Sequence, residues 1–279
     1  SVDLIVTDPP YFRVKKDAWD RQWNTPKLFL DWLDRVFAQF YRVLRPNGSL
    51  YVFASPKMAA RVEVLTDERF NVLSHIVWRK PSSRANQAEK EGLRAPFPAS
   101  ERIIFAEHKG SDNIAKGEAG YEAKCDKLRG FIFEPIRKYL DDERAAAGIS
   151  VREVAEAFQK KTGSRTVTGM AGHWFGTVQW ALPTLDNYQW LRSTLGGTFL
   201  SKSYEELRAQ YEELRRPFAV TADVPYTDVW DFPTVSHYAG KHNCEKPQAL
   251  LRHIITASSR PGAVVLDAFF GSGAVGEAA

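Results

Sequence analysis

Two short loops of this chain carry a carboxylate directly after an apolar run, and their residues can do chemistry. The first is Asp-Pro-Pro-Tyr at residues 8–11, after the apolar run 4–6. The second is Asp-Ala-Phe-Phe-Gly-Ser-Gly at residues 267–273, after the apolar run 264–266. Short apolar runs that end in turn residues are consistent with buried strands. We therefore expect two neighbouring strands of one sheet. One presents a reacting polar group on a rigid aromatic loop, and the other holds a small-molecule cofactor on a glycine-rich loop.

The two motifs, in this order, resemble those of the beta class of DNA amino-methyltransferases, which methylate adenine N6 or cytosine N4. Residues 8–11 look like the catalytic motif of that class. Residues 267–273 are similar to its S-adenosylmethionine motif, although Ala268 stands where proline is usual. Further similar fragments are residues 44–53, 76–80 and 245–247. The resemblance covers roughly residues 1–110 and 226–279, and it implies an enzyme of phage, prophage or bacterial type.

The catalytic motif suits the activation of an amino group on a nucleic-acid base. Such an amino group is a poor nucleophile because its lone pair is delocalised into the ring, and acceptors at both of its hydrogens make it reactive. Asp8 supplies one acceptor and the carbonyl of Pro9 the second. Pro9 and Pro10 fix two φ angles and lack N–H donors, so the loop is rigid. Tyr11 offers a ring face for a base extruded from the duplex, and we expect its hydroxyl to be dispensable.

By the same resemblance, S-adenosyl-L-methionine is the cofactor. Glycine lets backbone approach a ligand closely, although a Gly-x-Gly turn alone would not identify a cofactor. Lys246 and Pro247 are expected to wall the methionine end, and an ordinary surface lysine is the alternative for Lys246. The full set of expected cofactor-binding residues is Asp8, Lys246, Pro247, Asp267, Phe269, Gly271, Ser272 and Gly273.

The order of elements predicts an α/β fold. Strand patterns at 4–7, 49–53, 72–78, 100–107 and 264–266 alternate with helical patterns at 25–44, 56–67 and 248–258. Such alternation is typical of a mostly parallel, doubly wound (Rossmann-like) sheet with helices on both faces. We expect residues 1–109 to form the catalytic part of this domain and residues 226–279 its cofactor-binding part.

Residues 110–225 change in character and predict an inserted helical target-recognition region. Helical patterns cover 128–147 and 151–161, and Ser150 with Glu153 forms a capping-box pattern. A short helix beginning at Arg165 would complete a helix-turn-helix, although short helical pairs also occur without DNA. Residues 157–185 contain no Asp or Glu, which suits a phosphate-facing surface. We expect Trp174 and Phe175 to be buried rather than to touch bases, and 203–216 to form a charged surface helix.

Candidate DNA contacts lie in two loops that flank the catalytic half and in the helical region. The loops 12–27 and 79–99 combine cations with aromatics or prolines, although both could equally be solvated loops or a lid. Thr166 and Thr168 are expected to begin the recognition helix and to read bases. The expected contacts are Arg13, Lys15, Lys16, Arg79, Lys80, Arg84, Lys160, Lys161, Arg165, Thr166 and Thr168.

Composition permits this function without demanding it. The 279 residues carry a net charge of +4, and the two cysteines, Cys125 and Cys244, lack the spacing of a zinc site. No apolar run is long enough to span a bilayer and no signal peptide is recognisable. We expect a cytoplasmic protein of a bacterial cell or phage-infected host, with no metal. Both ends look truncated, and the ribose-binding acid of the family is expected beyond Ala279.

The sequence thus favours a methyltransferase that acts on adenine N6 in double-stranded DNA. Asp at the first catalytic position leans towards adenine, since the cytosine enzymes of this class more often carry Ser. Cytosine N4 is the nearest alternative. A DNA-binding protein that keeps the fold without catalysis is a further one. Protein-glutamine methyltransferases fit less well, because they generally begin the loop with Asn and place the cofactor motif first.

Overall fold

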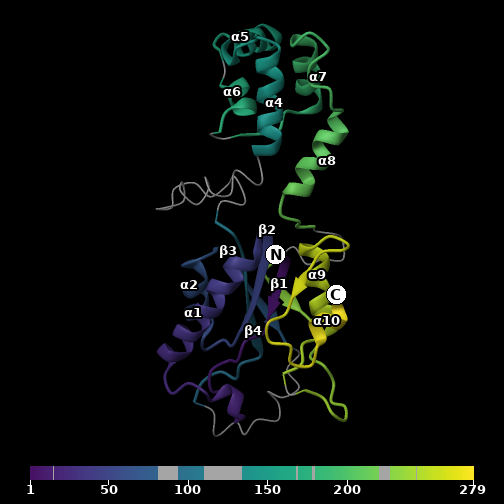
Figure 1. Ribbon diagram of the computed structural model, residues 1–279. Coiled ribbons are helices and arrows are strands. Elements are labelled where there is room, and N and C mark those ends of the chain that lie inside the picture. Colours follow the sequence, from purple (N-terminus) through teal and green to yellow (C-terminus); the bar gives the residue numbers. More distant parts are fainter. Residues whose placement is uncertain are drawn as a thin grey trace. The chain divides into compact units, whose positions relative to one another are not determined.

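The computed structural model describes residues 1–14, 16–80, 94–109, 134–167, 169–177, 180–219, 227–242 and 244–279. The chain divides into two compact units (Figure 1). The sheet unit comprises residues 1–109 and 217–279, and the helical unit comprises residues 110–216. Three of the expected DNA contacts, Lys15, Arg84 and Thr168, lie outside the described residues, as does Cys125.

The sheet unit is built on six strands in the order β5-β3-β4-β2-β1-β6. β1 pairs in parallel with β2 and with β6, and β3 pairs in parallel with β5. β4 is antiparallel to both β2 and β3, so the predicted mostly parallel sheet is confirmed with one reversed strand. The strands are β1 (Val2–Thr7), β2 (Leu44–Ala54), β3 (Asn71–Arg79), β4 (Ser100–Glu107), β5 (Val229–Asp231) and β6 (Val265–Leu266).

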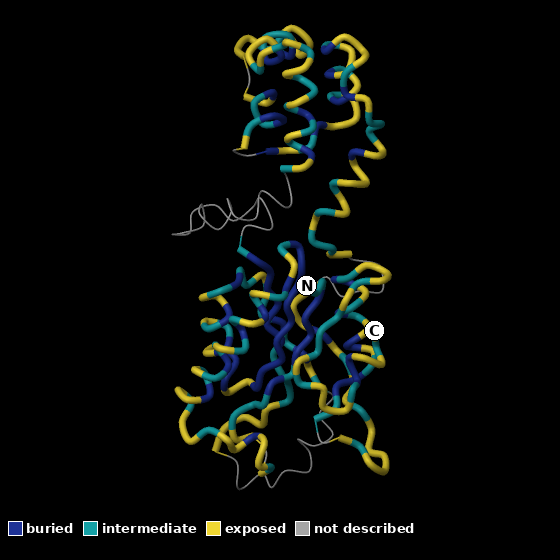
Figure 2. The backbone as a smooth tube through the Cα atoms, in the orientation of Figure 1, coloured by how far each residue is buried: buried dark blue, intermediate teal, exposed yellow. Residues whose placement is uncertain are grey.

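Helices cover both faces of this sheet (Figure 1). α1 (Pro26–Val43) and α2 (Ala59–Asp67) lie on one face, and α9 (Gln248–Ser258) and α10 (Ala274–Ala278) lie on the other. Successive side chains of a strand point to opposite faces. In β1, accordingly, Ile5 packs with α1 and α2, whereas Leu4 and Val6 pack with α9 and α10. The strands therefore form the buried middle layer in Figure 2.

β2 begins five residues earlier than the sequence predicted. The expected turn at residues 46–48 is instead an irregularity inside the strand, where the β1–β2 register shifts between Val2 and Leu4. Gly48 is needed there, because a Cβ would lie 2.9 Å from the carbonyl oxygen of Asp3. α1 starts as expected: the side chain of Thr25 accepts a hydrogen bond from the Leu28 N–H, and Pro26 occupies the first turn.

The helical unit contains α4 (Glu134–Ala146), α5 (Val151–Thr162), α6 (Met170–Phe175), α7 (Leu185–Thr194) and α8 (Tyr204–Leu214). The predicted capping box at Ser150 is present at the start of α5, and Ser203 forms a second one for α8. Trp174 and Phe175 are buried in the core of this unit, as expected. In neither unit does any described helix have the length and apolar character needed to cross a membrane.

The expected helix-turn-helix is wrong in its second half. α5 ends at Thr162, and the next helix begins only at Met170, after Gly163 takes a left-handed conformation. The separation exceeds the three- to four-residue turn of that motif. Arg165 and Thr166 therefore precede the helix and do not begin it. α6 has only six residues, and its Ala171, Trp174 and Phe175 are buried, so α6 serves the core of the unit.

Candidate active site

The two predicted motifs meet at one edge of the sheet. Asp8 follows β1 and Asp267 follows β6. Because these strands are parallel neighbours, their carboxyl ends lie together, which is where α/β sheets bind ligands. A cavity of about 410 Å³ opens at this edge and is lined by both carboxylates, by Pro9, Pro10 and Tyr11, and by residues of the glycine loop.

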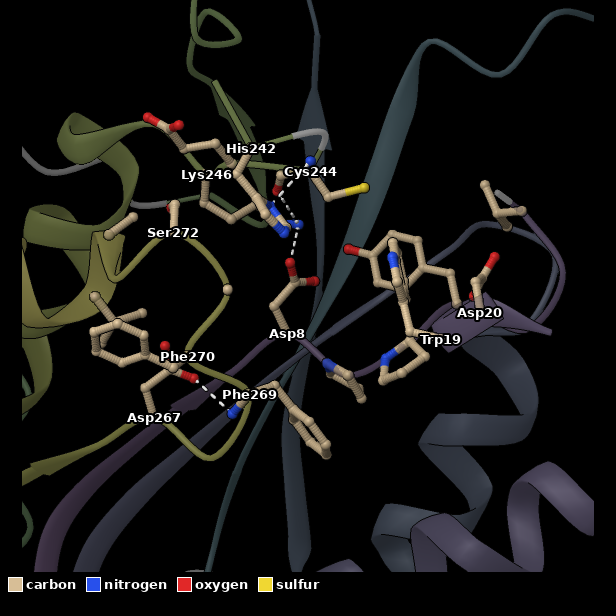
Figure 3. Close-up of a pocket in the computed structure, with 18 of the residues that line it drawn as sticks. Asp8, Trp19, Asp20, His242, Cys244, Lys246, Asp267, Phe269, Phe270 and Ser272 are labelled. Atoms are coloured by element: carbon tan, nitrogen blue, oxygen red, sulfur yellow. Dashed lines mark hydrogen bonds and ion pairs between the residues drawn. The ribbon is translucent and has the colours of Figure 1, made fainter. Parts of the chain in front are cut away.

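Asp8 stands between two halves of this cavity (Figure 3). Asp267, Phe269, Phe270 and Ser272 lie on one side of it, and we call this the glycine-loop half. Trp19 and Asp20 lie on the other side and, with Gln22, form what we call the tryptophan half. Lys246 reaches Asp8 from the segment before α9, and the carbonyl of Cys244 in the same segment accepts a hydrogen bond from Lys246. Asp8 therefore lies where the two halves of the cavity meet.

Lys246 forms an ion pair with Asp8, so the surface-lysine alternative is wrong. Its Nζ lies 2.5 Å from Asp8 Oδ2 and 3.3 Å from the carbonyl oxygen of Cys244, and the residue is only 6% exposed. Among the described residues, Asp8 Oδ1 is buried and has no hydrogen-bond partner. One carboxylate oxygen is therefore held, while the other can accept a hydrogen bond from a ligand.

Glu101, at the start of β4, joins this pair to Tyr11. The Tyr11 hydroxyl donates a hydrogen bond to Glu101 Oε2 at 2.8 Å. Lys80 forms an ion pair with the other Glu101 oxygen, and Lys246 Nζ lies 3.6 Å from Oε2. The expectation that the Tyr11 hydroxyl is dispensable therefore loses its basis, because loss of that hydroxyl removes a hydrogen bond to a largely buried carboxylate.

Burial and charge act against each other in this cluster. Burial raises the pKa of Asp8 above its ordinary value although Lys246 opposes it. Burial alone would raise the pKa of Glu101, but Lys246 and Lys80 outweigh burial and hold that pKa below its ordinary value. Burial alone would lower the pKa of Lys246, but Asp8 and Glu101 outweigh it, so the pKa lies above the ordinary value. Burial, with Asp8 and Glu101, puts the pKa of Tyr11 well above its ordinary value.

The glycine-loop half suits the predicted cofactor. Asp267 Oδ1 accepts a hydrogen bond from the Phe269 N–H at 3.1 Å, and burial raises the pKa of Asp267. The Phe269 ring packs 5.6 Å from that of Trp32 on α1, which leaves an apolar wall beside the carboxylate. Gly271 and Gly273 have φ angles of 53° and 79°, which favour glycine. An apolar wall beside a carboxylate fits a cofactor with a flat ring and polar substituents.

Two expected cofactor contacts fall outside the cavity lining. Pro247 is the N-cap residue of α9, and Gly273 is the N-cap residue of α10. Both positions support the residues that do line the cavity, Lys246 and Ser272. Sequence reasoning also missed several lining or supporting residues, namely Asp20, Gln22, Trp32, Glu101 and His242. Trp19 and Trp32 follow the catalytic motif in the sequence as aromatic residues, and this was the one sequence feature that could have indicated their place in the cavity wall.

The expected DNA contacts differ in their surroundings. Arg13 and Lys16 are exposed, and Arg13 Nε donates to the carbonyl of Trp23 at 3.3 Å. Arg79 forms an exposed ion pair with Asp231. Lys80 forms an ion pair with Glu101, and its role as a phosphate contact stays a prediction. In the helical unit Lys160, Arg165 and Thr166 are exposed, whereas Lys161 donates to Asn187 Oδ1 at 2.8 Å and lies over the Phe158 and Trp190 rings.

Comparison with known proteins decides the family. The family model for N6/N4 DNA methylases matches residues 2–279. The chain belongs to the N6/N4 DNA methylase family. It is therefore a DNA methyltransferase that uses S-adenosylmethionine, as the two motifs predicted.

Among curated proteins, the chain is similar to the DNA adenine methyltransferase YhdJ of Escherichia coli K12. The identity is 28% over 289 residues, covering 100% of this chain and 68% of that protein. It is also 28% identical over 101 residues to the type II methyltransferase M2.MboI of Moraxella bovis, covering 31% of this chain and 37% of that protein.

Solved structures align along nearly the whole chain at low identity. The complex of M1.HpyAVI with SAM matches at 16% identity and a TM-score of 0.47, covering 99% of this chain and 76% of that one. The cytosine-N4-specific PvuII DNA methyltransferase matches at 13% identity and a TM-score of 0.49, covering 100% of this chain and 71% of that one.

Proposed function

We propose that this N6/N4 DNA methylase transfers a methyl group to N6 of adenine in double-stranded DNA. The observation that carries the proposal is the state of Asp8, whose Oδ2 is held by Lys246 while its buried Oδ1 has no partner among the described residues. A buried acceptor without a partner is costly, so this oxygen favours a ligand with an N–H donor. An exocyclic amino group supplies that donor.

The residues around Asp8 provide what the reaction needs. Bound S-adenosylmethionine supplies an electrophilic methyl group on a positively charged sulfur. Asp8 Oδ1 and the carbonyl of Pro9 accept the two amino hydrogens, which directs the nitrogen lone pair out of the plane of the base. Asp8 would take the proton that the nitrogen loses as the N–C bond forms and the S–C bond of the cofactor breaks, which leaves a neutral thioether. The raised pKa of Asp8 favours that proton transfer. Positioning of the two reactants is the main catalytic effect.

The tryptophan half of the cavity is suited to the flipped base. Enzymes that modify a base take it out of the stack and hold it between aromatic or apolar side chains. Tyr11 and Trp19 both line this cavity, and Trp19 is 38% exposed. Gln22 Nε2 donates to the carbonyl of Trp19 at 2.9 Å and fixes that residue's backbone.

Adenine rather than cytosine is favoured by two observations. The first catalytic residue is Asp, which the resemblance associates with adenine more often than with cytosine. The E. coli relative that aligns with the entire chain is named a DNA adenine methyltransferase. Cytosine N4 remains the alternative, because the family model covers both amino groups. The helical unit is proposed as the target-recognition region, with Arg13 and Lys16 as additional contacts from the sheet unit.

The test is direct product analysis. Duplex DNA is incubated with the protein and S-adenosylmethionine, digested to nucleosides and measured by mass spectrometry. N6-methyladenine is the expected product. If N4-methylcytosine is the sole product, the target base is cytosine and not adenine. DNA binding without either product and without calorimetric binding of S-adenosylmethionine would support a non-catalytic DNA-binding protein.

A further inference from the structure

Glu101 occupies a place in the active site that its sequence position does not suggest. Because β4 is antiparallel, its first residues lie at the edge where β1 and β3 end, and Glu101 pairs in register with Trp78. Its side chain is only 15% exposed. Its Oε2 accepts a hydrogen bond from the Tyr11 hydroxyl at 2.8 Å, and the carboxylate forms ion pairs with Lys80 and Lys246. A carboxylate with three such partners is held firmly in place.

Four charges alternate in sign through this cluster, in the order Lys80, Glu101, Lys246, Asp8. The sum is neutral, so the cluster tolerates burial better than any member would alone. The pKa of Glu101 is held low by both lysines, hence Glu101 is ionised at neutral pH. The negative charge of Glu101 therefore acts on Lys246 at neutral pH.

Lys246 has three N–H donors, and three acceptors surround it. They are Asp8 Oδ2 at 2.5 Å, the carbonyl of Cys244 at 3.3 Å and Glu101 Oε2 at 3.6 Å. Glu101 draws the ammonium towards β4. Without it, one N–H of Lys246 could turn to Asp8 Oδ1 and take the acceptor that the target amino group needs.

Glu101 also fixes the stacking surface. The hydrogen bond from the Tyr11 hydroxyl sets the orientation of the ring, and Lys246 Nζ lies over that ring at 5.2 Å from its centroid. The cation thus occupies one face of Tyr11. Tyr11 and Asp8 both line the cavity, where a base can stack on the remaining face of the ring.

We propose that Glu101 is a positioning residue for methyl transfer, which fixes Tyr11 and Lys246 so that Asp8 keeps Oδ1 for the target amino group. This inference rests on the proposed function of Asp8. It goes beyond a structural ion pair because it predicts an effect on the ionisation of Asp8. The described groups that act on Asp8 are Lys246 and Glu101, Tyr11 of its own loop, and Asp267 of the glycine loop.

The test uses Glu101→Gln, which keeps the shape of the side chain and removes its charge. Single-turnover methyl transfer to duplex DNA is measured across pH in the full chain. We expect the rate at neutral pH to fall about 100-fold, the scale associated with a small misplacement of reacting groups, while calorimetric binding of S-adenosylmethionine is unchanged. The Glu101 charge raises the pKa of Asp8. The acid limb of the rate profile is therefore expected to move to lower pH in the variant.

The matched control is Glu63→Gln. Glu63 forms a part-buried ion pair with His75 in the same unit and does not line the cavity. It should keep the wild-type rate and pH profile. Glu101→Asp retains the charge on a shorter side chain, so it should lose rate while its acid limb stays at the wild-type pH.

Two results would overturn the inference. One is a Glu101→Gln variant with the wild-type rate and acid limb. The other is a variant that loses rate and cofactor binding together with an unmoved acid limb, as a purely structural role requires. If Glu101→Gln does not fold, Tyr11→Phe removes the same hydrogen bond, and wild-type turnover in that variant contradicts the inference. A wild-type protein that transfers no methyl group contradicts the proposed function as well.

Discussion

At the scale of single residues, the active site depends on the unequal surroundings of the two oxygens of Asp8. Oδ2 is bound to Lys246 and Oδ1 has no partner among the described residues. A lone carboxylate at the end of a strand would be solvated and free to rotate. Here the ion pair sets its orientation, so the remaining acceptor is preorganised for an N–H donor.

Asp8→Asn is expected to reduce single-turnover methyl transfer by at least about 10²–10³-fold, comparable to the loss of one preorganised hydrogen-bonding group elsewhere. Asn is nearly isosteric, so calorimetric binding of S-adenosylmethionine should persist. The control is Asp34→Asn, which removes a carboxylate from the part-buried pair with Arg69. Near-wild-type turnover in Asp8→Asn would show that another group activates the amino nitrogen.

The rate should also depend on pH in a defined direction. Asp8 must be ionised to accept the amino hydrogen, and burial raises its pKa in the folded protein. Methyl transfer is therefore expected to be full well above that pKa and to fall as pH drops through it. The midpoint should lie above the ordinary Asp value of about 3.9. A single-turnover rate that stays constant down to about pH 4 would contradict the assignment.

At the scale of elements, strand direction determines what the sequence could and could not predict. Asp8 and Asp267 were predicted together because both follow short apolar runs, and parallel neighbouring strands bring their carboxyl ends to one edge. Glu101 was missed for the same reason. In a wholly parallel sheet the start of a strand lies at the opposite edge, and only the reversal of β4 brings Glu101 to the site. A strand pattern carries no signal for that reversal.

The aromatic residues at the start of α1 support both loops. The rings of Phe29 and Phe12 pack with their centroids 5.7 Å apart, and those of Trp32 and Phe269 with their centroids 5.6 Å apart. One helix end thus braces the segment after the catalytic motif and the glycine loop. Phe12 and Arg13 have φ angles of 58° and 60°, a region that non-glycine residues rarely adopt and that such support makes tenable.

The glycine loop supplies a prediction at the same scale. Gly273 has a φ of 79°, and a Cβ there would lie 2.9 Å from Cζ of Phe270. Gly273→Ala should therefore cost about 1–2 kcal/mol in the loop conformation and weaken binding of S-adenosylmethionine. Gly276→Ala is the control, because nothing lies within 4 Å of that Cβ in the interior of α10. If the two variants have equal affinities for S-adenosylmethionine and equal melting temperatures, Gly273 is not required for the loop conformation.

At the scale of the whole molecule, the sequence predicted the sheet unit more accurately than the helical unit. Long amphipathic patterns located α1, α5 and α9 within a few residues. The segment between Gly163 and Met170 misled the prediction, since its polar residues and glycines fit either the start of a helix or a connection between two helices. The helix begins only at Met170, and its Trp174 and Phe175 are buried in the core of the unit.

This outcome changes which residues test DNA recognition by the helical unit. Lys161 contacts Asn187 and two aromatic rings, so its removal would disturb packing as well as charge. Lys160 and Arg165 are exposed in a stretch without acidic residues. They are the better choice for removing charge alone.

The double variant Lys160→Ala with Arg165→Ala should weaken binding to all duplex sequences about equally. The slope of log affinity against log salt concentration should flatten by about two phosphate contacts, because each cation that neutralises a phosphate releases a counterion. Lys138→Ala, from the exposed ion pair with Asp142 on α4, is the control and should leave the slope unchanged. Binding is measured across a salt series with circular dichroism to verify folding. An unchanged slope in the folded double variant would place the phosphate contacts on the sheet unit, where Arg13 and Lys16 are then the residues to remove.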